Sequence, residues 1–439
     1  MIRLYDWYNE ATVDLDQSLE QADISSPILV INETGFLPKG VLSPYAYFSE
    51  MASSDGKPLY FNQLPHPDFW EISGNNHQAE VMDYDKKRAI IYYAKPSHQR
   101  LIQNVDWLDE AGKVRYTDHY NQYGWRFAQT SFTETEEPIQ KTYFNRNQVE
   151  IITEHVKTGD IFLNWQKKTY HFKGRVPFIL FFLQEAGYDT SALWINSLST
   201  PFFVSLALPR DAKKDILFWQ EGLADQLPGN MQSILNNENG RIQTIVIQDK
   251  AVYEKALALA PDKAAHFVYL PPIYAQKETN ASPDDYLILT NSDQIEQLET
   301  LVAALPDKTF HIAALTEMSD RLSAYAAKPN VTLYPNVHME VIERLFKQCG
   351  VYLDINHGSE ILSATRLAYE HQLMLFAFNN TIHAPQLIPI DQQFEPAQVS
   401  ELLARLKQVT SNTLKANKDQ AQAEVHSLLR IYQEQLIGE

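Results

Sequence analysis

Residues 333–385 read LYPNVHMEVIERLFKQCGVYLDINHGSEILSATRLAYEHQLMLFAFNNTIHAP, and the pattern of this segment indicates how the chain folds. Met339, Ile342, Leu345 and Phe346 recur at helical spacing, which predicts a helix over 338–348. The apolar run 351–355 is typical of a buried strand, and a second helix (361–370) and strand (373–378) should follow it. Ligands of open parallel sheets bind at the carboxyl ends of the strands, so we expect the loop 356–360 at a binding edge.

Helices and strands alternate on both sides of this segment, which indicates an α/β chain with two Rossmann-like domains. We expect residues 1–77 and 173–275 to form a discontinuous N-terminal domain and residues 276–413 a C-terminal domain. Pro271 and Pro272 mark the hinge. A final helix within 414–439 should pack back across the junction and close the N-terminal domain.

Residues 78–172 have a different sequence pattern, in which short extended segments are separated by tight turns. This pattern predicts an inserted antiparallel β-meander. An open sheet leaves an edge and a face to be covered, either by dimerisation or by a partner sheet. The side chains that we expect at such a partner interface are Tyr116, His119, Tyr120, Trp125 and Phe127.

The composition excludes several classes of function. The 439 residues carry a formal net charge of −18, which argues against nucleic-acid binding. The single cysteine, Cys349, excludes an internal disulfide framework and suits a reducing cytosol. The histidines lack metal-ligand spacing, so we expect no metal and no cofactor. Because neither a signal peptide nor a membrane-spanning run is seen, we expect a cytoplasmic protein that could lie peripherally at the membrane only through partners.

The segment 351–378 resembles the nucleotide-sugar site of two-domain, GT-B-type glycosyltransferases. That site carries a Pro-Ser-x-x-Glu-Gly loop and a second Glu seven residues after the first. Here Glu360 can stand for the first acid, but no carboxylate follows before Glu370. Two interpretations stay open from this segment alone: a degenerate catalytic site on an intact scaffold, or a βαβ unit that never had this chemistry.

The start of the second domain favours degeneracy. GT-B enzymes usually place an Arg and a Lys just after its first strand, whereas no Lys or Arg lies between Lys277 and Lys308, an interval with seven acidic residues. A pyrophosphate would be repelled there. The polar residues at the expected edge are Asn291, Ser292, Asn356, His357, Ser359, Glu360, Asn379 and Asn380. Such amides and hydroxyls suit a peptide backbone, Ser/Thr side chains or sugar hydroxyls, although Ser359 or Asn356 could instead cap a helix.

The whole chain resembles one family. The opening MIRLYDWYNEATVDLDQSLEQA, the segment PILVINETGFLPKGVLSPYAYF, the inserted meander and CGVYLDINHGSEILSATRLAYEHQLMLFAFNNTIHAP are similar to GtfB-type subunits. These are the stabilising, or chaperone, subunits of the O-GlcNAc transferase of the bacterial accessory Sec system. The resemblance implies a GT-B-like fold, no catalytic activity of its own, a catalytic partner subunit (GtfA), and Ser/Thr acceptors in serine-rich repeat adhesins that are modified before export.

Two other functions stay open. The first is an active retaining GT-B glycosyltransferase that uses a UDP-sugar, with Glu360 and Glu370 as its acids. The second is a structural scaffold that stabilises the partner and never contacts the acceptor.

Overall fold

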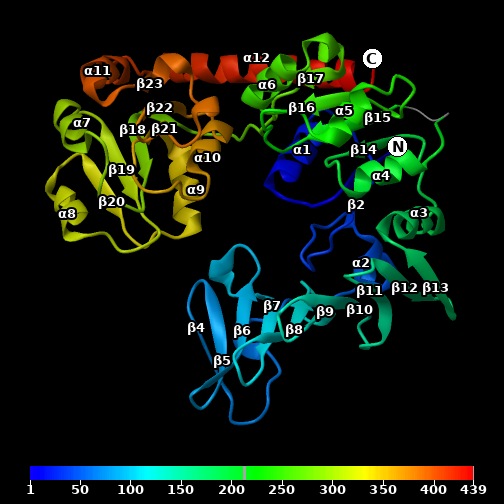
Figure 1. The fold of residues 1–439 in the computed structure, drawn as a ribbon. Helices are drawn as coiled ribbons and strands as arrows, with labels where there is room; N and C mark the ends of the chain where they lie inside the picture. The colour runs from blue at the N-terminus through cyan, green and yellow to red at the C-terminus, as the bar shows by residue number, and fades with distance from the viewer. Residues whose placement is uncertain (211–213, 439) are drawn as a thin grey trace. The chain divides into compact units, whose positions relative to one another are not determined.

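The computed structural model describes residues 1–210 and 214–438. The chain divides into two compact units, residues 1–272 and 273–439, which compares with the expected division at 275. Both units contain a parallel sheet, and the first also holds a ten-stranded antiparallel sheet (Figure 1). The predicted class, two Rossmann-like α/β domains with an inserted meander, is confirmed.

The parallel sheet of the first unit has seven strands in the order β17-β16-β15-β14-β1-β2-β3. Their bounds are β1 Ile2–Tyr5, β2 Ile28–Val30, β3 Val41–Leu42, β14 Leu193–Ile195, β15 Asp215–Trp219, β16 Ile242–Ile247 and β17 Phe267–Tyr269. Strand β1 was not predicted, because Arg3 interrupts its short apolar run. The guanidinium of Arg3 is nevertheless buried and lies 2.6 Å from Asp16, which ties β1 to helix α1 (Glu10–Gln21).

Helices connect these strands in the manner of a doubly wound domain. They are α1 Glu10–Gln21, α2 Pro44–Phe48, α3 Arg175–Glu185, α4 Thr200–Ala207, α5 Gly229–Leu235 and α6 Lys250–Leu259, with short 3-10 turns η1 Met51–Ser53, η2 Phe61–Gln63, η3 Ser97–Gln99 and η4 Pro261–His266. Asn9 accepts a hydrogen bond from the Thr12 amide and so caps α1.

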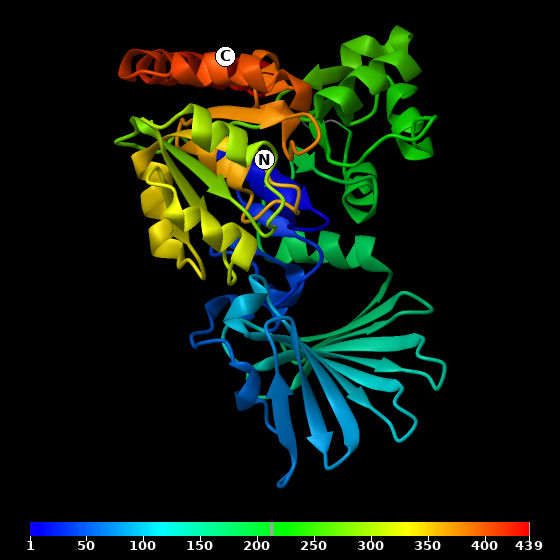
Figure 2. The same cartoon turned by 90° about the vertical axis from the view of Figure 1, so that its left-hand side faces the viewer.

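The antiparallel sheet runs in strict sequence order from β4 to β13, and its strands fan out side by side (Figure 2). Their bounds are β4 Glu71–Gly74, β5 Gln78–Asp83, β6 Lys86–Tyr93, β7 Ile102–Leu108, β8 Val114–Tyr120, β9 Arg126–Phe132, β10 Pro138–Phe144, β11 Glu150–His155, β12 Asp160–Trp165 and β13 Lys168–Lys173. Between β12 and β13, Gln166 and Lys167, both with positive φ, form a two-residue turn without the Asn-Gly signal that usually marks such a turn, so the sequence does not separate these two strands.

This sheet buries opposite faces at its two ends. Tyr143 of β10 stacks on Tyr45 of α2 with 4.1 Å between ring centroids, and Phe178 of α3 packs beside Tyr45. The register aligns Tyr143 with Ala128, His119 and Asn104 across β9, β8 and β7, so Val105 points to the other face. There Val105 joins a second apolar cluster. The meander therefore shares the first core with the parallel domain, and the aromatic residues that follow position 44 serve that packing.

The second unit is built on a six-stranded parallel sheet in the order β20-β19-β18-β21-β22-β23. Its strands are β18 Ser282–Leu289, β19 Thr309–Ala313, β20 Val331–Tyr334, β21 Cys349–Asp354, β22 Met374–Phe378 and β23 Gln393–Phe394. Its helices are α7 Leu298–Ala304, α8 Asp320–Ser323, α9 Met339–Gln348, α10 Ala364–Glu370, α11 Val399–Lys407 and α12 Ser411–Leu436, with η5 Ala324–Ala327, η6 Pro385–Leu387, η7 Ile390–Gln392 and η8 Pro396–Gln398.

Helix α12 groups with the second unit. Leu414 in its first turn packs in the core of that unit, and Asn417 donates a hydrogen bond to the Gln372 carbonyl over 3.2 Å. The closure of the first domain by residues 414–439 stays a prediction, and Glu439 lies outside the described residues.

Candidate functional site

The strand order of the second sheet contains one topological switch point. The chain builds outward from β18 through β19 to β20, then returns to β21 and builds the other way. Open α/β sheets bind ligands in the crevice at the carboxyl ends of the two strands that flank such a point. The loop after β18 and the loop after β21 therefore mark the site.

These two loops are joined to one another by backbone hydrogen bonds. The Glu296 amide donates to the Ile355 carbonyl over 2.8 Å, and the His357 amide donates to the Gln294 carbonyl over 3.0 Å. Ile295 and Asn356 thereby form an isolated antiparallel bridge. The chain's own backbone thus spans the switch point where a Rossmann-like domain would hold a ligand.

The buried side chain of Asn356 forms the centre of the site. Its Oδ1 accepts hydrogen bonds from Thr290 Oγ1 (2.8 Å) and from the Gly358 amide (3.1 Å), and its Nδ2 donates to Asn291 Oδ1 (3.2 Å). Asn291 in turn donates to Ser359 Oγ over 2.9 Å. A Cβ at Gly358 would lie 1.8 Å from Asn291 Oδ1, so glycine allows this close approach. We call Asn291, Asn356, Gly358 and Ser359 the amide cluster.

A second group surrounds the carboxylate of Glu296. His357 Nε2 lies 2.8 Å from Glu296 Oε2, and Asn380 Nδ2 donates to the same oxygen over 2.9 Å. Partial burial disfavours the charged carboxylate, but the hydrogen bonds from Asn380 and His357 outweigh it and lower the pKa of Glu296. Glu296 was counted in the sequence only as one of several repelling acids, yet it holds two of the predicted site residues together.

The sequence analysis also missed an ion pair beneath these loops. His383 Nδ1 lies 2.6 Å from Asp354 Oδ1, the His383 amide donates to Asp354 Oδ2 over 2.7 Å, and His383 Nε2 lies 2.8 Å from the Gly358 carbonyl. Both ring nitrogens lie beside oxygen atoms that can accept a hydrogen bond, an arrangement that favours the doubly protonated imidazolium. Burial opposes this charge, but the bonds to Gly358 and Asp354 raise the pKa of His383, while burial raises the pKa of Asp354. The signal was present: each residue follows or ends one of two adjacent strands, β22 and β21.

The remaining predicted residues have local roles. Ser292 Oγ accepts a hydrogen bond from the Gln294 amide, within the loop after β18. Glu360 accepts a hydrogen bond from the Thr365 amide over 3.0 Å and so satisfies one of the free N–H groups at the start of α10. That helix begins at Ala364, three residues later than expected, so neither Asn356 nor Ser359 caps it. Asn379 lies apart from the amide cluster and donates to Glu395 over 2.7 Å.

The two acids of the alternative enzyme do not meet. Glu360 precedes α10, whereas Glu370 ends it, and a helix that follows a strand in this fold returns to the opposite edge of the sheet. The Glu370 carboxylate lies 2.7 Å from Lys277 and 3.0 Å from Arg366, so it is occupied by two cations.

The predicted partner interface is only partly accessible. Tyr116 is 48% exposed, but Tyr120 and Phe127 are buried. Phe127 is the extra residue of a β-bulge, because Tyr120 pairs with Arg126 and His119 with Ala128, and its ring turns into the core. The ring nitrogens of His119 contact Asn104 and Thr130 at 2.7 and 2.8 Å. Trp125 packs partly buried against the same core.

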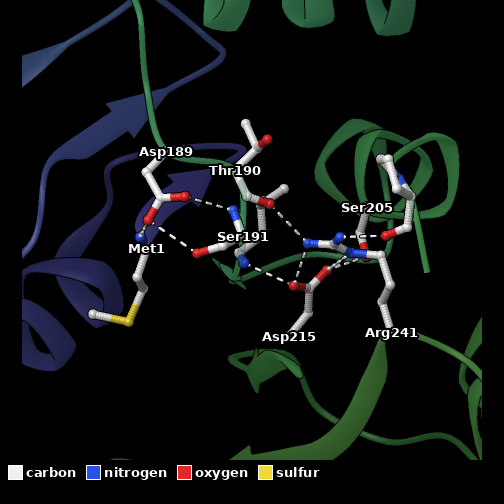
Figure 3. Close-up of polar contacts among 9 residues, drawn as sticks. Met1, Asp189, Thr190, Ser191, Ser205, Asp215 and Arg241 are labelled. Atoms are coloured by element: carbon white, nitrogen blue, oxygen red, sulfur yellow. Dashed lines mark hydrogen bonds and ion pairs between the residues drawn. The ribbon is translucent and has the colours of Figure 1, made fainter. Parts of the chain in front are cut away.

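One strongly buried ion pair of the first unit, between Asp215 and Arg241, lies at the edge of the sheet opposite to where a ligand would bind. Asp215, the first residue of β15, accepts two hydrogen bonds from Arg241 at 2.8 and 2.9 Å and one from the Leu193 amide at 2.7 Å (Figure 3). Ser205 Oγ donates to the same carboxylate over 2.5 Å. Strands β14–β16 begin here, so the Asp215–Arg241 ion pair stabilises the amino edge of the sheet, which is opposite to the ligand-binding edge.

No cluster of His, Cys, Asp and Glu among the described residues could hold a metal ion. No helix in the described part of the chain is long and apolar enough to cross a membrane.

Comparisons with known proteins agree along the chain. Residues 2–48, 70–173 and 175–259 match models of the GtfB N-terminal, middle and third domains, and residues 286–423 match the GftB/GlyA-F C-terminal domain. The chain is 46% identical over 386 residues, 88% of each chain, to the stabilizing protein GtfB of the UDP-N-acetylglucosamine–peptide N-acetylglucosaminyltransferase of Streptococcus parasanguinis. It is 42% identical to the Streptococcus agalactiae protein of the same description, over 100% of this chain and 99% of that one.

The solved structures give the same picture. A chain of a GtfA/B complex bound to UDP and GlcNAc matches with a TM-score of 0.90 at 42% identity, covering 100% of this chain and 99% of that one. The pneumococcal O-GlcNAc transferase GtfA matches at 13% identity with a TM-score of 0.54, which shows a shared fold alone. The chain belongs to the GtfB family of stabilizing proteins of peptide N-acetylglucosaminyltransferases.

Proposed function

We propose that this chain is the non-catalytic subunit of a protein O-GlcNAc transferase, which stabilises a GtfA-type catalytic partner and holds the polypeptide acceptor for it. The acceptor is the serine-rich repeat region of an adhesin, whose Ser and Thr side chains are glycosylated in the cytoplasm before export. Catalysis and the binding of the sugar nucleotide belong to the partner.

One observation carries the proposal: the switch point of the second sheet is spanned by the chain itself. The bridge between Ile295 and Asn356 joins the two loops that would flank a nucleotide. The groups gathered there are amides, hydroxyls, the His357 ring and the Glu296 carboxylate, and no Lys or Arg lies between Lys277 and Lys308. Binding a diphosphate at this edge requires positive charge or free backbone N–H groups. In the bridge, the amides of Glu296 and His357 already donate to backbone carbonyls.

The amide cluster suits a neutral, hydrogen-bonding ligand. Asn291 is exposed and carries both a donor and an acceptor at the surface of the cluster, as a Ser/Thr-rich polypeptide requires. Such repeats are disordered and bind weakly one by one. A subunit that holds them beside a catalytic partner raises their effective concentration at the active site without chemistry of its own.

The ten-stranded sheet supplies a surface for the partner. Tyr116 and Phe162 are 48% and 37% exposed, and the register places both on the face opposite to Tyr143, away from α2 and α3. His171 stacks on Phe162 with 4.7 Å between ring centroids. We propose this face, in place of the buried Tyr120 and Phe127, as the partner interface.

The proposal is tested on the purified chain by calorimetry with a UDP-sugar and, separately, by fluorescence anisotropy with a labelled Ser/Thr-repeat peptide. We expect the peptide to bind and the nucleotide not to bind. Saturable UDP-sugar binding with slow release of sugar would instead support an active glycosyltransferase.

A variant pair separates acceptor holding from a purely structural role. Asn291→Ala removes the exposed amide of the amide cluster, and Asn379→Ala removes a matched amide at the same edge that lies outside it. We expect Asn291→Ala to weaken peptide binding several-fold, with the partner complex intact, and Asn379→Ala to leave it unchanged. A chain that supports the partner's activity but never binds the peptide would be a scaffold only.

A further inference from the structure

The second unit contains a small cavity that the proposed function does not use. Its volume is about 80 Å³, and it lies between the end of α10, β22, η7 and the first half of α12. Apolar side chains, among them Leu373 and Leu375, line part of it. A cavity of this size holds several water-sized groups, because one water needs roughly 10–15 Å³.

Two glutamines line the cavity without an internal partner. Gln372 and Gln392 are each 8% exposed, and the Oε1 atom of each is buried with no hydrogen-bond partner among the described residues. Leaving a buried amide unpaired costs free energy, so such groups call for a ligand or ordered water.

The backbone at Gln372 adds a second observation. Gln372 follows the cap residue of α10 and has a φ of 60°, a position where glycine is least strained. Its carbonyl accepts a hydrogen bond from Asn417 Nδ2, which fixes the turn against α12. The fold therefore places an amide side chain at the cavity at a backbone cost that glycine would avoid.

The charge of the lining selects the ligand. Among the lining residues only Glu424 is charged, and Gln420 Nε2 donates to its carboxylate over 3.0 Å at the mouth of the cavity. Two buried carbonyl oxygens, a carboxylate and apolar walls together suit a planar cation with several donors on an aliphatic stem. Lysine offers a compact point charge, whereas a guanidinium presents several N–H donors in one plane, which suits a carboxylate together with amide oxygens.

We propose that this cavity is a binding site for a guanidinium group on an aliphatic stem, with Gln372 and Gln392 as its buried acceptors and Glu424 as its counter-ion. The occupant is either an arginine side chain of a bound polypeptide or a free guanidino compound. Both sources share the same recognition chemistry, and neither depends on the amide cluster at the switch point.

The test uses the full chain and titrates N-acetyl-arginine methylamide, its neutral citrulline analogue and free L-arginine by ligand-observed NMR. We expect the arginine amide to bind at least tenfold more tightly than the citrulline amide. If free L-arginine binds at least tenfold more weakly than N-acetyl-arginine methylamide, the occupant is an arginine side chain of a polypeptide. If the two bind equally, the occupant is a free guanidino compound. No binding, or equal binding of citrulline, would overturn the proposal.

Three variants locate the site. Gln392→Leu removes one buried acceptor and breaks no hydrogen bond, so the chain should fold, and we expect affinity to fall at least tenfold. Glu424→Gln removes the exposed counter-ion without touching the core and should cost several-fold. Gln422→Leu, on the same helix but outside the lining, is the control. Unchanged affinity in both Gln392→Leu and Glu424→Gln would show that the ligand binds elsewhere and that water alone fills the cavity.

Discussion

Replacing Gly358 by alanine is the sharpest perturbation of the amide cluster. The new Cβ would lie 1.8 Å from Asn291 Oδ1 and 2.8 Å from its Cγ, so the Asn291 side chain must turn away. It then loses the hydrogen bonds to Asn356 Nδ2 (3.2 Å) and Ser359 Oγ (2.9 Å). Asn291 is exposed, so its own groups are solvated by water after the displacement.

The expected size of the effect follows from these two bonds. Each hydrogen bond contributes a net ~0.5–1.5 kcal/mol, so the loops after β18 and β21 lose about 1–3 kcal/mol, which is roughly a 5- to 150-fold change in an opening equilibrium. The backbone bonds of Glu296 and His357 report this opening, because their amides span the switch point. We expect their hydrogen-exchange protection to fall by that factor, and the affinity for a Ser/Thr-repeat peptide to fall with it.

A double-mutant cycle decides whether the clash with Asn291 is the cause. Asn291→Ala removes the same two bonds and the obstacle, so Gly358→Ala should cost less than about 0.5 kcal/mol more in that background. Gly222→Ala is the control, because a Cβ there meets open space. Additive costs in the cycle, or unchanged exchange at Glu296 and His357, would refute the reasoning.

Three further perturbations test other parts of the chain. Arg241→Met strands the buried Asp215 carboxylate and should destabilise the first unit by about 3–5 kcal/mol, measured by urea unfolding; a loss below 1 kcal/mol would contradict a structural role. Phe127→Ala should cost roughly 3–5 kcal/mol of stability through its core position, whereas Tyr116→Glu should leave stability unchanged and weaken only binding of the partner, assayed by pull-down and calorimetry. The pKa values of His383 and Asp354 are both raised, so the folded state binds protons more readily than the unfolded chain. The stability contributed by this pair is therefore present below the unfolded pKa of His383 and is lost as the pH rises through the folded pKa. His383→Gln should flatten this pH dependence, measured by hydrogen exchange in the Gly358 loop.

Much of the fold could be predicted because its signals are local. The apolar runs of β15, β16 and β21 are buried strands in the sequence itself, and the short turns of the meander fix an antiparallel neighbour order. Elements whose signal is not local were missed. Strand β1 contains Arg3, whose burial depends on Asp16 in α1, and the turn between β12 and β13 has no glycine.

The candidate site shows the same difference between features with a local sequence signal and features that depend on distant residues. The loops at the carboxyl edge, the absence of Lys and Arg after β18 and the family could all be predicted, because they depend on residue order and charge alone. Three contacts became known only from the folded chain: Ile295 bridges Asn356, Glu296 holds His357 and Asn380 together, and Phe127 turns inward at a bulge. Those contacts join residues more than 60 positions apart or depend on register, and neither the spacing nor the polarity of a side chain states which neighbour the packed sheet will bring to it.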